Sequence, residues 1–124
     1  MADRSYRPRL AIKRVFDAPS PRDGKRVLVD RLWPRGLTKE KAHVDEWRRV
    51  LAPSDVLRKW FAHDPKRFLR FRALYRIELL RHPDELAELV VEAEKRPVTL
   101  LFAAKDSEHC NATVLKELLD ENLY

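Results

Sequence analysis

Residues 98–103 read VTLLFA, a run without a charged residue that begins directly after Pro97. Its apolar residues follow one another instead of alternating with polar ones. This pattern predicts a strand covered on both faces, as in the parallel sheets of α/β proteins. A second strand is expected from Val27 to Leu32, within the segment 26–36, RVLVDRLWPRG. A further strand, the first in the chain, is expected over 10–16.

Signals for helix starts and ends recur through the rest of the chain: a polar capping residue, a proline at the first helical position, or a proline after the end. The expected helices run from Thr38 to about Leu51, from Ser54 or Asp55 to Phe61, from Asp64-Pro65 along Phe68, Phe71, Leu74, Tyr75 and Leu79, from His82-Pro83-Asp84 towards Pro97, and from Asp106 or Ser107 along Ala112, Leu115, Leu118 and Leu119.

Strands separated by helices predict an α/β fold. We expect a small, mainly parallel sheet of three strands or slightly more, packed with about five helices in a single three-layer domain over 1–124. Residues 1–8 are polar and are expected to form a loose N-terminal arm. The connection 17–24 is short for a crossover helix, so an antiparallel pair of the first two strands is an alternative.

Composition limits the class of protein. Hydrophobic residues make up 44% of the 124 residues, and no apolar run is long enough to span a bilayer. The first residues lack the apolar stretch of a signal peptide. Cys110 is the only cysteine, so it forms no internal disulfide. These features predict a protein of the reducing cytoplasm that does not enter a membrane.

The net charge of +6 favours anionic partners, such as nucleotides, other phosphorylated small molecules or nucleic acid. The alternative is that the charge serves solubility, because 20 acidic residues are interspersed with the 26 basic ones. Gly24 and Gly36 are the only glycines, which excludes a Gly-rich phosphate loop. Because no pair of histidines or carboxylates has metal-ligand spacing, we expect neither a metal nor a cofactor.

The carboxyl ends of the strands over 27–32 and 98–103 carry unusual side chains. Ligands of open α/β sheets collect beyond such ends. If the two strands are parallel neighbours, Arg31, Arg35 and Lys105 converge near free backbone N–H groups at the start of the last helix. Guanidinium groups beside such N–H groups would form an anion site. Trp33 would add a stacking wall or a cation–π partner.

Asp30 and His109 are the candidate catalytic residues at this edge. Asp30 can orient the neighbouring arginines or act as a base, and the alternative is an ion pair with Arg31 that only ends the strand. His109 can transfer a proton near neutral pH, or it can cap the helix or face solvent. Cys110 can be a nucleophile with a lowered pKa, although a lone cysteine is more often a small buried apolar residue. The remaining histidines are expected to be structural: His43, His63 and His82.

A second candidate site is helical. A short helix, a turn and an Arg-rich helix resemble a helix-turn-helix in outline, and the arginines concerned are Arg67, Arg70, Arg72, Arg76 and Arg81. At 3.6 residues per turn they spread over several faces, which favours a solvated basic helix. The corresponding function is a non-catalytic nucleic-acid-binding or regulatory module.

Five segments together resemble the YeaO-like branch of an uncharacterised bacterial domain-of-unknown-function family: KRVFD at 13–17, RVLVDRLWPRG at 26–36, DEW at 45–47, LRKWFAHDP at 57–65 and VTLLFAAKDSEHCNATVL at 98–115. The resemblance covers nearly the whole chain and implies an α/β fold with the two strand-end motifs close together. The positions that match the family pattern are Asp30, Arg31, Trp33, Pro34, Arg35, Gly36, Lys105, His109 and Asn111.

Cys110 departs from that pattern. The branch usually shows Asn at this position, and the wider family tends to carry a Cys-His-Arg run in this region, so no mechanism through Cys110 is implied. The expected function is binding of an anionic, phosphorylated or nucleotide-like ligand, with an enzymatic role for Asp30 and His109 left open. The expected ligand-binding residues are Arg31, Trp33, Arg35, Lys105 and Asn111.

Overall fold

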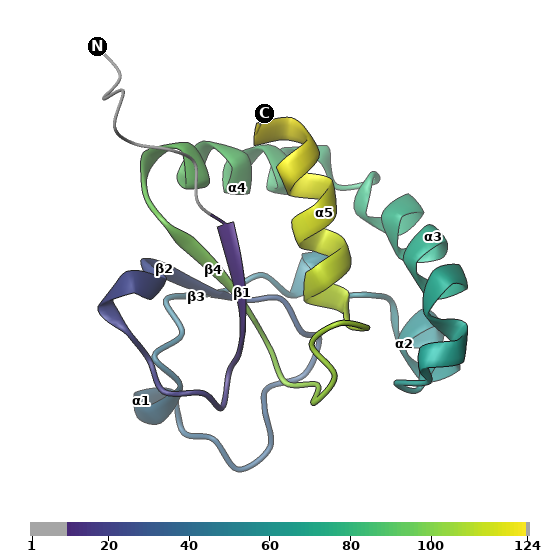
Figure 1. The fold of residues 1–124 in the computed structure, drawn as a ribbon, viewed down its shortest axis with the longest axis horizontal. Coiled ribbons are helices and arrows are strands. Elements are labelled where there is room, and N and C mark those ends of the chain that lie inside the picture. The colour runs from purple at the N-terminus through teal and green to yellow at the C-terminus, as the bar shows by residue number, and fades with distance from the viewer. Residues whose placement is uncertain (1–9, 124) are drawn as a thin grey trace.

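The structure is a computed structural model that describes residues 10–123. The expected N-terminal arm, residues 1–8, lies outside the described residues. The centre of the fold is a four-stranded parallel sheet in the order β1-β4-β2-β3 (Figure 1). Its strands are β1 (Leu10–Arg14), β2 (Lys25–Leu28), β3 (Glu46–Trp47) and β4 (Val98–Phe102). The predicted α/β class is confirmed, with a sheet slightly larger than three strands.

Five α-helices lie among the described residues: α1 (Lys39–Ala42), α2 (Asp55–Phe61), α3 (Phe68–Leu79), α4 (Pro83–Lys95) and α5 (Asn111–Leu123). Short 3₁₀ turns cover Pro21–Asp23, Arg49–Leu51 and Pro65–Arg67. The capping signals are confirmed at three starts, where the side chains of Thr38, Ser54 and Asp64 accept the N–H groups of Lys41, Leu57 and Lys66. None of the helices within residues 10–123 has the length and apolar character needed to cross a membrane.

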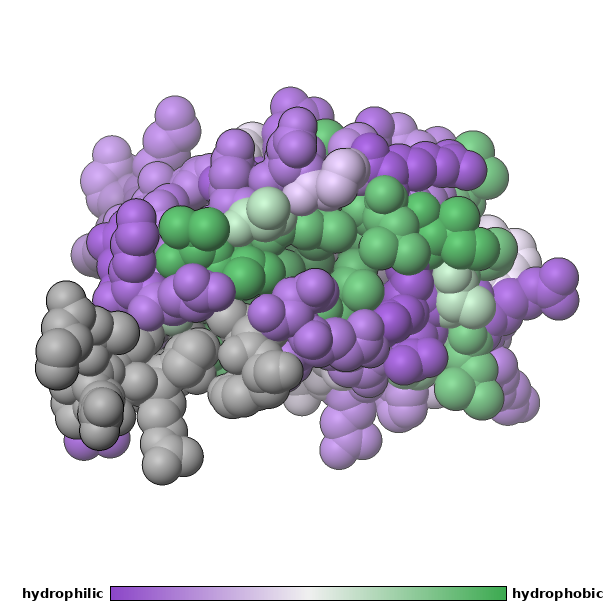
Figure 2. Space-filling model, turned by 90° about the horizontal axis from the view of Figure 1, so that it is seen from above, coloured by the Kyte–Doolittle hydropathy of each residue, from purple (hydrophilic) through white to green (hydrophobic). Residues whose placement is uncertain are grey.

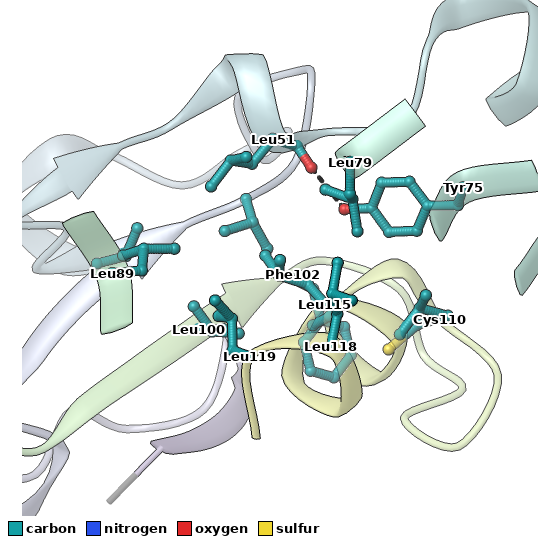
Figure 3. Close-up of a cluster of buried hydrophobic side chains, with 14 of the residues drawn as sticks. Leu51, Tyr75, Leu79, Leu89, Leu100, Phe102, Cys110, Leu115, Leu118 and Leu119 are labelled. Atoms are coloured by element: carbon teal, nitrogen blue, oxygen red, sulfur yellow. Dashed lines mark hydrogen bonds between the residues drawn. The ribbon is translucent and has the colours of Figure 1, made fainter. Parts of the chain in front are cut away.

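The larger hydrophobic core lies between the sheet and α2 to α5. β4 is buried along its whole length. Figure 3 shows its Leu100 and Phe102 beside Leu115 and Leu119 of α5. A smaller core on the opposite face contains Leu28, Leu101, Val15 and Ala42, and Trp33 and Leu37 pack against it. These two cores produce the three layers.

A buried charged cluster joins the smaller-core face of the sheet to α1. The Arg26 guanidinium donates to the Asp23 carboxylate at 2.6 Å and to the carbonyls of Ala42 and His43 at 2.9 Å each. Lys13 also donates to Asp23, at 3.2 Å. Burial would raise the pKa of Asp23, but hydrogen bonds from the Ser20 N–H, Arg26 and Lys13 outweigh it and hold this pKa below its ordinary value.

The antiparallel alternative for the first two strands is wrong, because β4 lies between β1 and β2 and is parallel to both. β1 has five residues, about 16 Å of strand, so the connection 15–24 can return to the start of β2 without a crossover helix. The connection is held along β4 by hydrogen bonds. The Thr99 hydroxyl donates to the Asp23 carbonyl at 2.7 Å, and the Lys25 N–H donates to Pro97 O at 3.0 Å.

The helix predicted from Thr38 to about Leu51 is wrong in its length, because α1 ends at Ala42. His43 adopts a left-handed conformation with φ 49°, and the chain then joins the sheet as β3. The N–H of Asp45 donates to Arg26 O and that of Arg48 to Leu28 O, each at 2.9 Å. Sheet hydrogen bonds therefore replace the helical ones that local signals predict.

The last helix also begins later than predicted, at Asn111. The Asp106 carboxylate accepts the N–H groups of Glu108 and His109 at 3.0 and 3.1 Å, so it closes a local turn instead of capping the helix. On α3, Leu74 was predicted to face the core but is exposed. This helix presents apolar side chains on more than one face, and the periodicity of the sequence does not show which of these faces is buried.

Candidate functional site

A cleft of about 370 Å³ opens beyond the carboxyl ends of β2 and β4. β2 ends at Leu28, short of the predicted Leu32, and residues 30–35 leave the sheet to form one wall of the cleft. Ala103 and Asn111, which follow β4 in the chain, line the same cleft. The parallel pairing of β2 with β4 brings these segments to one edge, as expected for neighbouring strands of an open sheet.

Asp30 connects the segments that meet at this edge. One carboxylate oxygen accepts the Asn111 side-chain amide at 3.0 Å, and the other accepts the Ala103 N–H at 2.9 Å. Asn111 donates to Val29 O as well, at 3.0 Å, and Trp47 Nε1 donates to Asp30 O at 2.7 Å. The carboxylate at the strand end therefore orients Asn111 and the end of β4, and its hydrogen bonds go to these groups instead of to Arg31 or Arg35.

The carboxyl group of Asp30 lies in a largely desolvated position. Burial raises the pKa of Asp30 above its ordinary value, although the hydrogen bonds from Asn111 and Ala103 and the nearby charges of His63 and Arg58 act in the opposite direction. The residue is thus an acidic group held inside a cleft whose other charged side chains are basic.

The basic side chains of the cleft come from two parts of the chain. Arg31 and Arg58 both approach Asp55 Oδ1, at 3.1 and 3.3 Å. The Nε of Arg58 is shielded from solvent and has no hydrogen-bond partner among the described residues. Arg35 is exposed and forms no ion pair within residues 10–123. His63, in a left-handed turn with φ 56°, also lines the cleft beside these arginines.

The remaining walls of the cleft are apolar. Phe61 of α2 and Phe71 of α3 stack with ring centroids 4.1 Å apart and line the cleft together. Trp33 lies on the opposite wall of the cleft. Its Nε1 donates to Leu37 O at 2.6 Å, and its ring meets Trp47 edge-on with centroids 5.5 Å apart. Because the polar atom of Trp33 is already paired, this side chain offers the cleft an apolar surface.

Comparison with known proteins identifies the family. Residues 9–124 match the sequence model of a family described as the inactive DUF488-N3 subclade. The chain belongs to this family. It is 43% identical to the uncharacterized protein YeaO of Escherichia coli strain K12 over 107 residues, which cover 86% of this chain and 93% of that protein. It is 39% identical to the uncharacterized protein Rv3073c of Mycobacterium tuberculosis strain H37Rv over 112 residues, 90% of this chain and 94% of that protein. No solved structure matches the chain significantly.

The predicted resemblance to the YeaO-like branch is therefore confirmed, and it helps to explain which residues sequence reasoning missed. Arg58, Phe61 and His63 line the cleft, and they lie in the segment 57–65 that carries part of the family resemblance. Sequence reasoning interpreted this segment as one half of a helix-turn-helix and His63 as structural. Its match to the family was the signal that could have linked it to the strand ends.

Two predicted site residues lie away from the cleft walls. Lys105 is exposed and does not line the cleft. His109 Nδ1 lies 2.8 Å from Asp106 Oδ2, and its ring meets Phe68 edge-on with centroids 5.1 Å apart. The turn closed by Asp106 thus directs both residues elsewhere, whereas Arg31, Trp33, Arg35 and Asn111 share the cleft with Asp30, and their roles stay predictions.

Cys110 lines the cleft with a buried side chain directly before α5. Its sulfur lies 3.3 Å from Thr113 Oγ1 and 3.7 Å from Ser107 O. Burial raises the pKa of the Cys110 thiol, so the reactive thiolate is disfavoured. These contacts are typical of a small packed side chain.

The arginines of α3 are distributed over several faces, as their spacing predicts. Arg72 pairs with Glu117 at 2.7 Å and Arg76 with Glu121 at 2.9 Å, both on α5. Arg67, which lies directly before α3, approaches Asp64 at 3.7 Å. Much of the charge on this helix is therefore matched within the fold. Among the described residues, no three His, Cys, Asp or Glu side chains gather where they could hold a metal ion.

Asp30→Asn and Asp23→Asn are expected to change the pH dependence of the free energy of unfolding in opposite directions. Because the pKa of Asp30 is raised in the native state, its carboxyl group keeps its proton there at pH values where the unfolded state has lost it. Its contribution therefore lowers the free energy of unfolding as pH rises from the ordinary aspartate pKa of about 3.9 through the folded value. The lowered pKa of Asp23 adds stability that is complete above that ordinary value and is lost on acidification through the folded pKa.

Urea unfolding of both variants and the wild type, in steps from about pH 3 to 7, tests this expectation. The difference in unfolding free energy, wild type minus Asp30→Asn, should decrease with pH. The corresponding difference for Asp23→Asn should increase. Differences that change in the same direction for both variants would contradict the two pKa assignments.

Proposed function

We propose that the cleft binds a small anionic ligand, phosphorylated or nucleotide-like, and that the protein acts by binding it. The observation that carries the proposal is an arginine without an ion pair beside a second arginine with a shielded, unpartnered N–H, both at an apolar cleft. Arg35 has no ion-pair partner among the described residues, and Arg58 Nε is shielded without a hydrogen bond. A shielded guanidinium N–H without a partner is costly, and a phosphate oxygen is the type of acceptor that satisfies it.

The shape and lining of the cleft support a ligand that joins a flat apolar group to the anion. Its volume of about 370 Å³ lies in the usual range of small-molecule sites, about 300–1,000 Å³. Trp33, Phe61 and Phe71 provide aromatic walls, which suit a planar ring such as a nucleobase. Arg31 and Arg58 are held by Asp55, so they are preorganised at low entropic cost.

Four observations favour binding over turnover. The family model that the chain matches is described as inactive. His109, the residue expected to transfer a proton, lies outside the cleft walls, and the Cys110 thiol is buried with a raised pKa. Both oxygens of Asp30 already accept hydrogen bonds from the protein, which suits an orienting residue better than a free base.

Arg35→Ala is expected to weaken ligand binding about ten- to a hundredfold, which corresponds to the loss of one charge-assisted hydrogen bond, about 1.5–3 kcal/mol. The measurement is a thermal-shift screen with nucleotides, sugar phosphates, pyrophosphate and short DNA and RNA, followed by calorimetric titration of the compounds that stabilise the protein. Because the Arg35 side chain is exposed, the variant should keep the wild-type melting temperature without ligand.

Arg70→Ala is the matched control, because Arg70 is an exposed arginine of α3 that does not line this cleft. It should bind the phosphorylated compound as the wild type does. If Arg35→Ala binds as tightly as the wild type, the proposed site is wrong. The other outcome is that DNA or RNA binds instead, equally to wild type and Arg35→Ala but more weakly to Arg70→Ala and at high salt. That result would support the nucleic-acid-binding alternative.

A further inference from the structure

The outward face of α3 is apolar although the helix already buries its opposite face. Phe71 and Tyr75 of the inward face are almost fully buried. On the outward face Leu69 is 80% exposed, and Ile77 and Leu80 are exposed as well. A helix that is apolar on both sides normally has a neighbour on both sides, and a cluster of large exposed apolar residues marks an interaction surface.

A groove between α2 and α3 continues this surface. Its volume is about 580 Å³, and its apolar lining comes from Val56 and Trp60 of α2 and from Leu74 and Ile77 of α3. Val56 is 81% exposed. Figure 2, which views the molecule from above Figure 1, shows a band of hydrophobic surface between hydrophilic regions. We call the groove and the outward face of α3 the α2–α3 surface.

The charge beside the α2–α3 surface is net positive, because two arginines and one carboxylate line its groove. Arg70 and Arg81 line the groove and form no ion pair within residues 10–123. Glu78 also lines it, but both of its carboxylate oxygens accept hydrogen bonds from Ser54, at 2.8 and 2.6 Å. Asp55, the neighbouring carboxylate of α2, is held by two arginines of the ligand cleft.

We propose that the α2–α3 surface binds an acidic amphipathic helix of a partner protein. Such a helix places its apolar residues in the groove and its carboxylates against Arg70 and Arg81, as in other helix-in-groove complexes. Arg70 lies in the first turn of α3 and Arg81 lies just beyond its end, and eleven residues of helix would rise about 16 Å. A partner helix of roughly three turns spans that length.

Self-association through this surface is disfavoured by the same charges. If two copies met face to face about a two-fold axis, Arg70 and Arg81 would approach like charges. The carboxylate that lines the groove, Glu78, already has its oxygens occupied by Ser54. Charge complementarity therefore indicates an acidic partner rather than a second copy of this chain.

The test uses a fluorescein-labelled peptide of roughly three to four helical turns, with leucines at i, i+3, i+4 and i+7 and glutamates elsewhere. Fluorescence anisotropy should show saturable binding to the full chain, weakened by added salt. Ile77→Glu should reduce the affinity at least tenfold, because it places a carboxylate in the apolar groove. Arg70→Glu should reduce it as well, and a peptide with lysines in place of the glutamates should not bind.

Val91→Glu is the matched control, since Val91 is an exposed apolar residue of α4 outside the groove. It should bind the peptide as the wild type does, and thermal unfolding should show that all variants are folded. The proposal is overturned if the peptide does not bind or if Ile77→Glu binds it as tightly as Val91→Glu does. It is also overturned if sedimentation shows a dimer that only Ile77→Glu dissociates, or if the surface prefers phosphatidylglycerol vesicles to the peptide.

Discussion

Replacing Arg26 by alanine is expected to lower the free energy of unfolding by about 3 kcal/mol, because Asp23 then loses its closest partner in a buried position. Arg26 is 4% exposed, and its guanidinium lies 2.6 Å from the Asp23 carboxylate. The change also removes the donor to the carbonyls of Ala42 and His43 at the end of α1. Lys13 stays 3.2 Å from Asp23, which keeps the loss at the lower end of the range for broken buried pairs, about 3–5 kcal/mol.

Urea unfolding followed by circular dichroism measures this loss. Arg96→Ala is the matched control, because Arg96 is an exposed residue that pairs with Glu92 at 3.3 Å one helical turn away. Exposed pairs of this type contribute about 0.3–0.5 kcal/mol. If the two variants lose similar amounts, the cluster around Asp23 does not hold the connection 15–24 and α1 to the sheet as inferred here.

Gly24→Ala is expected to cost at least about 2–3 kcal/mol, since two independent effects act at this position. A Cβ atom on Gly24 would lie 2.1 Å from Pro97 O, and the backbone φ is +63°. Pro97 O accepts the Lys25 N–H at 3.0 Å, so it cannot move aside without breaking the hydrogen bond at the start of β2. The clash therefore has to displace backbone.

Gly36→Ala separates the two effects. Gly36 also has a positive φ, +80°, but a Cβ there would meet nothing within 4 Å. Only the conformational cost remains, about 1–2 kcal/mol. Unfolding midpoints of the two variants, measured side by side, should therefore place Gly24→Ala clearly below Gly36→Ala. An equal loss would mean that the close approach to Pro97 is not what requires glycine.

Most helix starts were predictable because their causes are local. Ser54 and Asp64 accept backbone N–H groups within two or three residues of themselves, and Pro65 and Pro83 occupy first positions of helical turns. Where distant partners compete, local signals failed. The stretch after α1 joins β2 as β3 instead of continuing the helix, and Asp106 closes a turn with His109 instead of starting α5.

The candidate site likewise has a part that the sequence predicts and a part that it does not. The run after β2 and the start of α5 were expected together because neighbouring parallel strands end at the same edge, and Asp30 does contact Asn111. Arg58 and His63 were missed because they reach the cleft through core packing. The stacked rings of Phe61 and Phe71 join the end of α2 to α3. Both rings line the cleft, and no spacing within α2 encodes that approach.

The amino-acid sequence by itself determined the α/β class, the starts of α2 and of the turn before α3, and the chemistry of the two strand ends. These depend on hydrophobic runs and on hydrogen bonds between near neighbours in the chain. Only the tertiary structure decided that β4 lies between β1 and β2, that Arg58 joins the cleft while Lys105 does not, and that one side of α3 stays exposed. Each of these depends on contacts between segments far apart in sequence, whose free energy is realised only when the whole core is assembled.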